Sequence, residues 1–220
     1  MVNKIILRKV LPQVFRGSEA EAPVNSSEIW LREEVVFSRP GNYIVEAESG
    51  TGKSSLCAFI YGSRTDFDGD ILFDGEPVKR FSIEKWCELR CRSLAYLPQE
   101  MRLFPELTAM ENIRIKNRLT DFKSEVQIRE MLERFELDSK TDSPAGLLSV
   151  GQQQRVAIIR ALCQPFDFLL IDEPVSHLDA RNNRTVAQLI EEEAKAAHAA
   201  VIATSVGNKI TLAEYELLKL

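Results

Sequence analysis

Residues 47–55 of this chain read Ala47-Glu48-Ser49-Gly50-Thr51-Gly52-Lys53-Ser54-Ser55. The apolar run at 43–45 before them predicts a short strand, and Leu56, Phe59 and Ile60 after them have the i, i+3, i+4 spacing of a helix. The two glycines let the backbone curl until successive N–H groups face an anion. The N-terminus of the following helix directs its free N–H groups and its dipole to the same point. The order strand, glycine-rich loop, helix therefore predicts a phosphate-binding loop.

The loop matches the pattern G-x-x-x-x-G-K-[ST], except that Ala47 stands at the first glycine position. In this pattern Lys53 reaches the β- and γ-phosphates of a nucleotide, and the hydroxyl of Ser54 ligates Mg²⁺. An alanine fits the first turn of the loop when its φ is negative, so the match is only modestly weakened. The alternative is an incidental lysine in a glycine-rich loop, but the flanking strand and helix favour the phosphate site. The predicted nucleotide-binding residues are Ser49, Gly50, Thr51, Gly52, Lys53, Ser54 and Ser55.

A second apolar strand ends in two carboxylates, in the stretch Phe168-Leu169-Leu170-Ile171-Asp172-Glu173-Pro174. Ligands of parallel sheets bind at the carboxyl ends of the strands. We expect Asp172 to hold Mg²⁺ through a water molecule, and Glu173 to polarise an attacking water as general base. Two acids after one strand can arise by chance, but their combination with the lysine loop favours a catalytic site.

The rest of the chain predicts an α/β fold. Strand-like segments are expected at 5–7, 30–37, 43–45, 69–75, 168–171 and 199–204, a closing strand in 212–220, and helices from 53 to Gly62, at 125–135, 149–163 and 184–197. Strands that alternate with helices indicate a parallel sheet covered on both faces. We expect one domain, with a mixed β lobe and a parallel-sheet nucleotide-binding core at about 1–98 and 155–220 and an inserted helical subdomain at about 99–154.

Composition limits the class of protein. The chain has 220 residues, with 28 basic and 33 acidic side chains and a formal charge of −5. This length suits a single domain that needs no disulfides. The mild acidity argues against a generally basic nucleic-acid-binding protein. No apolar run approaches the roughly 18–20 residues that cross a bilayer, and the N-terminus is too short and charged for a signal peptide. We expect an intracellular, soluble chain.

Four cysteines are scattered along the chain: Cys57, Cys87, Cys91 and Cys163. Cys87 and Cys91 are four residues apart and could share one face of a helix with a metal ion. No histidine or further cysteine lies near them to complete a zinc site. We therefore expect reduced, buried thiols.

The stretch Leu148-Ser149-Val150-Gly151-Gln152-Gln153-Gln154-Arg155 resembles the signature segment L-S-G-G-Q of the ATP-binding-cassette (ABC) ATPases. Three further segments resemble motifs of that family: the β-lobe hairpin at 68–75, the Q-loop at 97–100 and the D-loop at 176–179. The resemblance runs from about residue 4 to the C-terminus. It implies the ABC type of P-loop NTPase fold, with ATP and Mg²⁺ as ligands.

The resemblance also implies a dimer. Two cassettes would pair head-to-tail, with each ATP between the phosphate loop of one and the signature segment (Ser149, Gly151 and Gln152) of the other. There, Ser149 and the N–H of Gly151 would hold the γ-phosphate. Gln99 is implied to touch Mg²⁺ and to relay the nucleotide state to the helical subdomain. Asp179 is the D-loop aspartate. Phe15 is the candidate for stacking on adenine, with a place in the core as its alternative.

Two positions depart from the family pattern. Val150 replaces the first signature glycine and crowds the approach to phosphate. Val206, in Thr204-Ser205-Val206-Gly207, stands where the family has a switch histidine that contacts the γ-phosphate. The histidines of the chain, His177 and His198, lie elsewhere, and His177 could substitute for the missing imidazole or be an exposed interface residue. Because Lys53, Asp172 and Glu173 are present, we expect ATP binding and dimerisation with slow hydrolysis.

The function implied is the ATPase subunit of an ABC transporter that drives a separate transmembrane permease. Such a subunit would be cytoplasmic and would lie at the inner face of the cell membrane through its partner. It would act as a homodimer or with a second cassette, and without nucleic acid. The alternative is an ATP-sensing ABC module that regulates a partner protein without transport, which the altered switch position favours somewhat.

Overall fold

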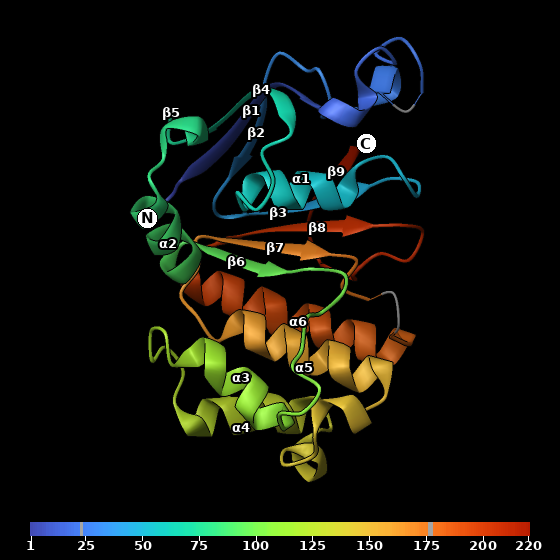
Figure 1. Cartoon of the computed structure of the whole chain (residues 1–220). Helices are drawn as coiled ribbons and strands as arrows, with labels where there is room; N and C mark the ends of the chain where they lie inside the picture. Colours follow the sequence, from blue (N-terminus) through green and yellow to red (C-terminus); the bar gives the residue numbers. More distant parts are fainter. Residues whose placement is uncertain (23, 176–177) are drawn as a thin grey trace.

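The protein is described by a computed structural model that covers residues 1–22, 24–175 and 178–220. Two sheets stack on either side of helix α1 (Lys53–Ile60), and further helices cover the far face of the second sheet (Figure 1). The first sheet is antiparallel, with strand order β2-β1-β4-β5. Its strands are β1 (Lys4–Pro12), β2 (Val35–Ser38), β4 (Phe67–Phe73) and β5 (Glu76–Pro77). The predicted Asp74-Gly75 turn joins β4 to β5, and both residues have the positive φ that a tight hairpin turn requires.

The second sheet is parallel and confirms the expected α/β class. Its strand order is β6-β7-β8-β3-β9. The strands are β3 (Gly41–Glu46), β6 (Leu94–Leu97), β7 (Phe168–Asp172), β8 (Ala200–Ser205) and β9 (Glu216–Lys219). Strand β7 lies between β6 and β8, and all five of its residues are buried. Strand β9 is the closing strand that was expected near the C-terminus.

The two faces of the parallel sheet pack into two different cores. Side chains alternate along a strand, so Phe168 and Leu170 of β7 face α1 and the antiparallel sheet, whereas Leu169 and Ile171 face the other helices. This burial on both faces explains why the strands read as continuous apolar runs rather than as alternating ones.

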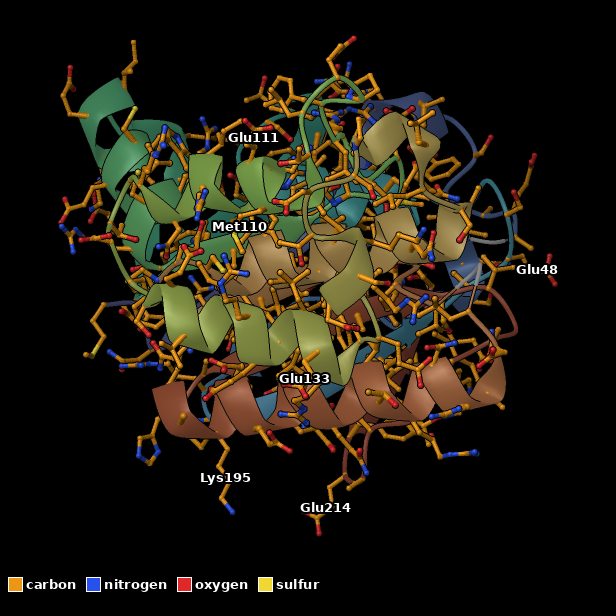
Figure 2. The ribbon with its side chains drawn as sticks, turned by 90° about the horizontal axis from the view of Figure 1, so that it is seen from below. Glu48, Met110, Glu111, Glu133, Lys195 and Glu214 are labelled. Atoms are coloured by element: carbon orange, nitrogen blue, oxygen red, sulfur yellow. The ribbon has the colours of Figure 1, made fainter. Side chains whose placement is uncertain are left out.

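Helices α5 (Val150–Leu162) and α6 (Ala180–Ala197) lie against the face away from α1, and α3 (Ala109–Asn117) and α4 (Glu125–Arg134) pack beyond them (Figure 1). Seen from below, Met110 is buried beneath α3, while Glu133 and Lys195 lie at the surface (Figure 2). Helices α3, α4 and α5 begin with capping boxes at Thr108, Ser124 and Ser149. The segment predicted as the helical subdomain contains α3 and α4, but its division from the rest of the chain stays a prediction. No helix of the described residues is long and apolar enough to cross a membrane.

The structure corrects three expectations from the sequence. The strand expected at 30–37 is wrong for its first half, because Leu31 has a φ of 58° and the regular ladder with β1 contains Val35–Ser38. Leu31 and Arg32 make single backbone hydrogen bonds to β1 outside that ladder. Helix α6 begins at Ala180, four residues earlier than expected, because the Asp179 carboxylate caps it by accepting the N–H of Asn182. The four cysteines are free, but Cys87 is exposed on α2 (Ile83–Arg92) and Cys91 is half-buried, so only Cys57 and Cys163 are buried thiols.

Candidate functional site

The loop at 47–55 connects β3 to α1 at the carboxyl edge of the parallel sheet. Gly50 and Gly52 have φ values of 86° and 99°, a region that L side chains rarely adopt. Gly52 is the N-cap of α1 and no side chain caps it, so the first N–H groups of the helix are available to an anion. The loop therefore has the backbone geometry that a phosphate cradle requires.

Two aromatic side chains pack against the loop: Trp30, which the sequence did not connect with it, and Phe15, the predicted adenine-stacking residue. The indole of Trp30 donates to the backbone carbonyl of Thr51 at 3.0 Å and is buried. A Cβ at Gly52 would come within 3.1 Å of the Trp30 ring and 3.4 Å of the Phe15 ring. Phe15 thus lies beside the phosphate loop and is half-buried, which leaves part of its ring accessible.

Lys53 is only 5% exposed and lies across the loop. Its Nζ donates to the carbonyl of Glu48 at 2.7 Å, and the hydroxyl of Thr51 donates to the same carbonyl at 2.9 Å. The Lys53 Nζ is also 3.8 Å from Oε1 of Glu173. The predicted phosphate lysine and the predicted general base therefore face each other.

Around Glu173 the structure brings together groups from four elements. The side-chain amide of Gln99 donates to Glu173 Oε2 at 3.2 Å. The hydroxyl of Thr204, at the end of β8, donates to Oδ1 of Asp172 at 2.6 Å and accepts the N–H of Glu173 at 3.2 Å. Gln154 of α5 donates to the Glu173 carbonyl at 3.3 Å. Sequence reasoning missed Thr204 and Gln154, since no local pattern tells which residues lie opposite Asp172 and Glu173.

Ser54, Gln99 and Asp172 line one cavity of about 380 Å³. A hydroxyl, an amide and a carboxylate offer the oxygen ligands that Mg²⁺ prefers, so the residues predicted from the sequence fit this ion. Arg64 lines the same cavity, and it donates to Oγ of Ser55 at 2.8 Å. Cys57 of α1 is completely buried. Burial, and to a smaller extent the charge of Asp172, raise the pKa of its thiol well above the ordinary value.

The signature residues lie at the start of α5. Ser149 is the N-cap, its hydroxyl accepts the N–H of Gln152, and Oε1 of Gln152 accepts the N–H of Ser149. The hydrogen bonds of these two side chains stay within the first turn, and Val150 is 49% exposed. Together with Gly151, they present an accessible helix N-terminus.

Asp179 lies at the start of α6, where hydrogen bonds from the backbone and side chain of Asn182 lower the pKa of its carboxyl. Asn182 also accepts from Arg155 of α5 at 3.0 Å, which joins the D-loop aspartate to the signature helix. Val206 is 42% exposed and lines a hollow of about 490 Å³ with Glu48 and Thr51 of the phosphate loop. Ser176 and His177 of the predicted D-loop lie outside the described residues.

Comparisons with known proteins agree with this geometry. Residues 43–176 match the family described as ABC transporter. The dimeric structure of MJ0796, a bacterial ABC transporter cassette, is 24% identical, with a TM-score of 0.75 over 98% of this chain and 94% of that one. A post-hydrolysis dimer of the MJ0796 cassette with ADP and Pi is 22% identical, with a TM-score of 0.68 over 91% of this chain and 87% of that one. A bacterial Atm1-family ABC exporter with ATP bound is 23% identical, with a TM-score of 0.72 over 93% of this chain but 35% of the exporter.

The structural matches establish the fold, and the family match covers well over half of the chain. The phosphate loop, the carboxylates after β7 and the capped signature helix are all in the matched segment or directly connected to it. The chain therefore belongs to the ABC transporter family and is an ATP-binding cassette of the ABC ATPase fold.

Proposed function

We propose that this cassette hydrolyses ATP and drives a separate membrane-spanning subunit of a transporter. The observation that carries the proposal is the convergence of Lys53, Gln99, Asp172 and Glu173 at the carboxyl edge of the sheet. A structural role alone would not require a lysine and a glutamate with low exposure to face each other beside an uncapped helix N-terminus.

The roles of the residues follow from their positions. The N–H groups of the loop and Lys53 bind the phosphates, and Ser54, Gln99 and Asp172 hold Mg²⁺, which neutralises phosphate charge. Glu173 accepts a proton from the attacking water, since its carboxylate lies beside Lys53 and Gln99, next to the expected phosphate site. The half-buried Phe15 ring stacks on the base.

Dimer closure is the proposed source of mechanical work. MJ0796 is a dimer in both of its structures, and the start of α5 in this chain is accessible. Ser149 and the N–H of Gly151 would contact the γ-phosphate held by a partner cassette, with Gln152 and Asp179 at the same interface. The partner is a second copy or a related cassette, at the inner face of the membrane.

Slow hydrolysis is the further part of the proposal. The aliphatic side chain of Val206 neither donates nor accepts a hydrogen bond, and Val150 adds bulk where the phosphate would approach α5. Transition-state charge on the γ-phosphate is therefore left with fewer stabilising groups.

The test is the Val206→His variant, with Val206→Ala as its control. We expect ATP turnover by the histidine variant to rise at least about tenfold, while the alanine variant stays at the wild-type rate. A wild-type turnover already in the ordinary range of about 1–10³ s⁻¹ and unchanged by histidine would overturn slow hydrolysis. Transport is tested separately by co-purification from membranes, and a chain recovered without any membrane protein counts against it.

A further inference from the structure

Glu173 has an unusual backbone conformation. Its φ is 52°, in the left-handed region that side chains other than glycine rarely adopt. It lies directly after β7, at the point where the chain leaves the sheet. A residue in this conformation persists only when surrounding groups hold it there, so its neighbours decide where the carboxylate points.

Thr204 holds the amino side of this residue. The parallel pairing of β7 with β8 places Thr204 opposite Asp172, and Thr204 is completely buried. Its single hydroxyl proton goes to Oδ1 of Asp172 at 2.6 Å, and its oxygen accepts the N–H of Glu173 at 3.2 Å. One hydroxyl therefore orients both the expected Mg²⁺-binding carboxylate and the peptide of the general base.

Gln154 holds the carboxyl side. It lies on α5, five residues after Ser149, and is 3% exposed. Its Nε2 donates to the Glu173 carbonyl at 3.3 Å, whereas its Oε1 is buried without a hydrogen-bond partner among the described residues. A buried oxygen without a hydrogen bond costs folding free energy. This cost indicates that the role of the Gln154 amide is the hydrogen bond that its nitrogen donates.

We propose that Thr204 and Gln154 are positioning residues that hold the Glu173 peptide from its two sides and thereby aim the Glu173 carboxylate at the attacking water. The inference rests on the proposed ATP hydrolysis. Lys53 and Gln99 contact the carboxylate itself, so they do not replace a lost hold on the peptide. Without these two hydrogen bonds, the left-handed backbone of Glu173 is held less firmly and the carboxylate would move.

The experiment compares Thr204→Val, which keeps the shape and loses the hydroxyl, with Thr204→Ser, which keeps the hydroxyl. We expect Thr204→Val to lower kcat about 10- to 100-fold, because a displacement of about 1 Å has such an effect. Thr204→Ser restores a rate near that of the wild type. Gln154→Met, similar in shape but without the amide, is expected to lower kcat in the same direction.

ATP binding is the second readout. Trp30 donates to the phosphate loop, so its fluorescence in a Trp86→Phe background reports binding independently of turnover. We expect the Kd for ATP measured in EDTA, without Mg²⁺, to stay within about threefold in all these variants, since none of the substituted side chains lies on the loop. Loss of ATP binding together with turnover would mean a general structural role and would overturn the inference.

A double-mutant cycle with Glu173→Gln completes the test. If Thr204 acts through Glu173, Thr204→Val reduces the residual rate of the Glu173→Gln protein by much less than it reduces the wild-type rate. Full additivity overturns the inference. Failure of the proposed function looks different: the wild type binds no ATP, or Glu173→Gln leaves its hydrolysis unchanged. If Thr204→Val does not fold, Gln154→Met and Thr204→Ser still decide the outcome through their kcat values.

Discussion

Strand β7 has an aspartate at each end, and the two are used in different ways. Asp167 precedes the strand at the amino edge of the parallel sheet, and Asp172 ends it at the carboxyl edge. Both side chains are buried. Each lines a cavity, but both carboxylate oxygens of Asp167 accept hydrogen bonds from protein donors. Asp172 accepts a hydrogen bond from the hydroxyl of Thr204 and shares its cavity with Ser54 and Gln99.

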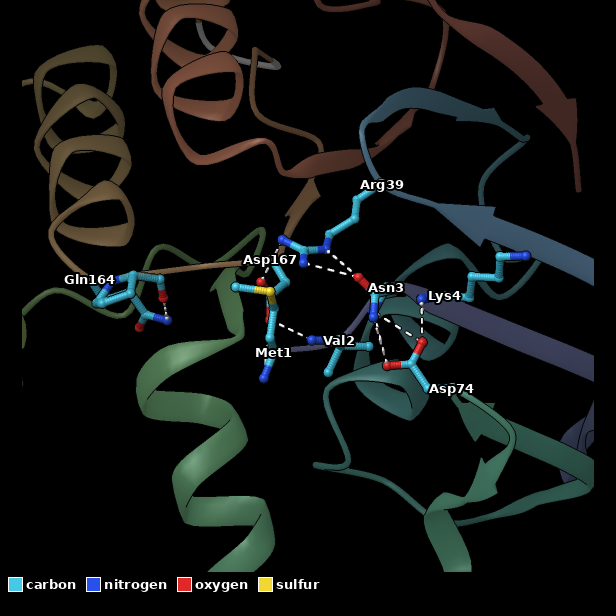
Figure 3. Close-up of polar contacts among 9 residues, drawn as sticks. Met1, Val2, Asn3, Lys4, Arg39, Asp74, Gln164 and Asp167 are labelled. Carbon is cyan, nitrogen blue, oxygen red and sulfur yellow. Dashed lines mark hydrogen bonds and ion pairs between the residues drawn. The ribbon is translucent and has the colours of Figure 1, made fainter.

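At the amino edge the carboxylates accept hydrogen bonds from protein donors (Figure 3). Asp167 accepts the N–H of Val2 at 2.7 Å and a guanidinium N–H of Arg39 at 2.9 Å. Asp74, from the turn of the antiparallel sheet, accepts the N–H groups of Asn3 and Lys4. The start of β1 is thereby tied to both sheets, and this edge contributes to stability.

At the carboxyl edge the groups remain partly available. The helix N-terminus at Gly52 has no side-chain cap, Glu173 has a left-handed φ, and the buried hydroxyl of Ser205 has no hydrogen-bond partner among the described residues.

Unsatisfied and strained groups cost folding free energy. Among the described residues the amino edge also has such groups, in the buried Oε1 of Gln164 and the left-handed φ of His198. The carboxyl edge differs in its uncapped helix N-terminus, which lies beside Lys53 and the cavity lined by Ser54 and Asp172, and this arrangement suits a ligand.

The largest effect is expected from Glu173→Gln. Removal of the general base should lower the kcat for ATP at least about 100-fold, because positioned bases contribute about 10²–10⁴-fold. ATP affinity and the free energy of unfolding should change little, since the amide keeps the shape and the neighbours. Steady-state phosphate release and ATP titration measure the two quantities. A rate within tenfold of the wild type would remove Glu173 from the mechanism.

The next effect is at the opposite edge. Asp167→Ala leaves the Arg39 guanidinium buried without its carboxylate, so the free energy of unfolding should fall by about 3 kcal/mol. The kcat of the folded fraction should not change. Urea unfolding followed by tryptophan fluorescence gives the first value, and Arg39→Met in a double-mutant cycle isolates the pair. If Asp167→Ala instead lowers kcat and leaves the free energy of unfolding unchanged, it is wrong to assign stability to the amino edge and catalysis to the carboxyl edge.

Helix caps extend the comparison to α3 and α5. Ser149→Ala and Thr108→Ala each remove a capping box and should each lower the free energy of unfolding by about 1 kcal/mol. Only Ser149→Ala should also weaken ATP-dependent dimerisation, measured by sedimentation or light scattering. Equal effects of both variants on dimerisation would argue that Ser149 has no role beyond its cap.

The smallest effect is expected at the two buried thiols, which lie near opposite edges of the parallel sheet. Cys57 lies near Asp172, and Cys163 near Lys123 and Glu193 of the amino-edge cavity. In a Cys87→Ser, Cys91→Ser background, ATP with Mg²⁺ at twice its Kd should slow the alkylation of Cys57 by iodoacetamide about threefold. Alkylation of Cys163 should slow less, and equal protection of both thiols would indicate that ATP stabilises the whole fold without distinction.

Burial also raises the pKa of Cys163 to about 12. An unfolded thiol ionises near pH 8.5, so the unfolded state binds fewer protons than the native state between these two values. The stability contributed by the buried thiol is therefore complete below about pH 8.5 and is lost as the pH rises toward 12. Cys163→Ala should weaken this alkaline decline in the free energy of unfolding.

Local signals account for most of what could be predicted. The phosphate loop follows from glycines that allow positive φ, β7 from an apolar run, and the start of α5 from a serine three residues before a glutamine. Each signal acts over a few residues, so it operates whatever the rest of the chain does. The strand predicted at Trp30-Leu31 is wrong because of a contact that is distant in sequence. Trp30 favours a strand by its residue type, but its indole donates a hydrogen bond to Thr51 of the phosphate loop.

The sequence by itself determined the α/β class and the cassette family, and it predicted Lys53, Asp172, Glu173 and Ser149 as site residues, because their chemistry and spacing are local. Only the tertiary structure decided what holds them. Thr204 meets Asp172 across 32 residues of chain, through the register of two paired strands, and Gln154 reaches Glu173 from a helix packed on the sheet. Register and packing depend on the summed contacts of the whole core, and no short pattern of residues records them.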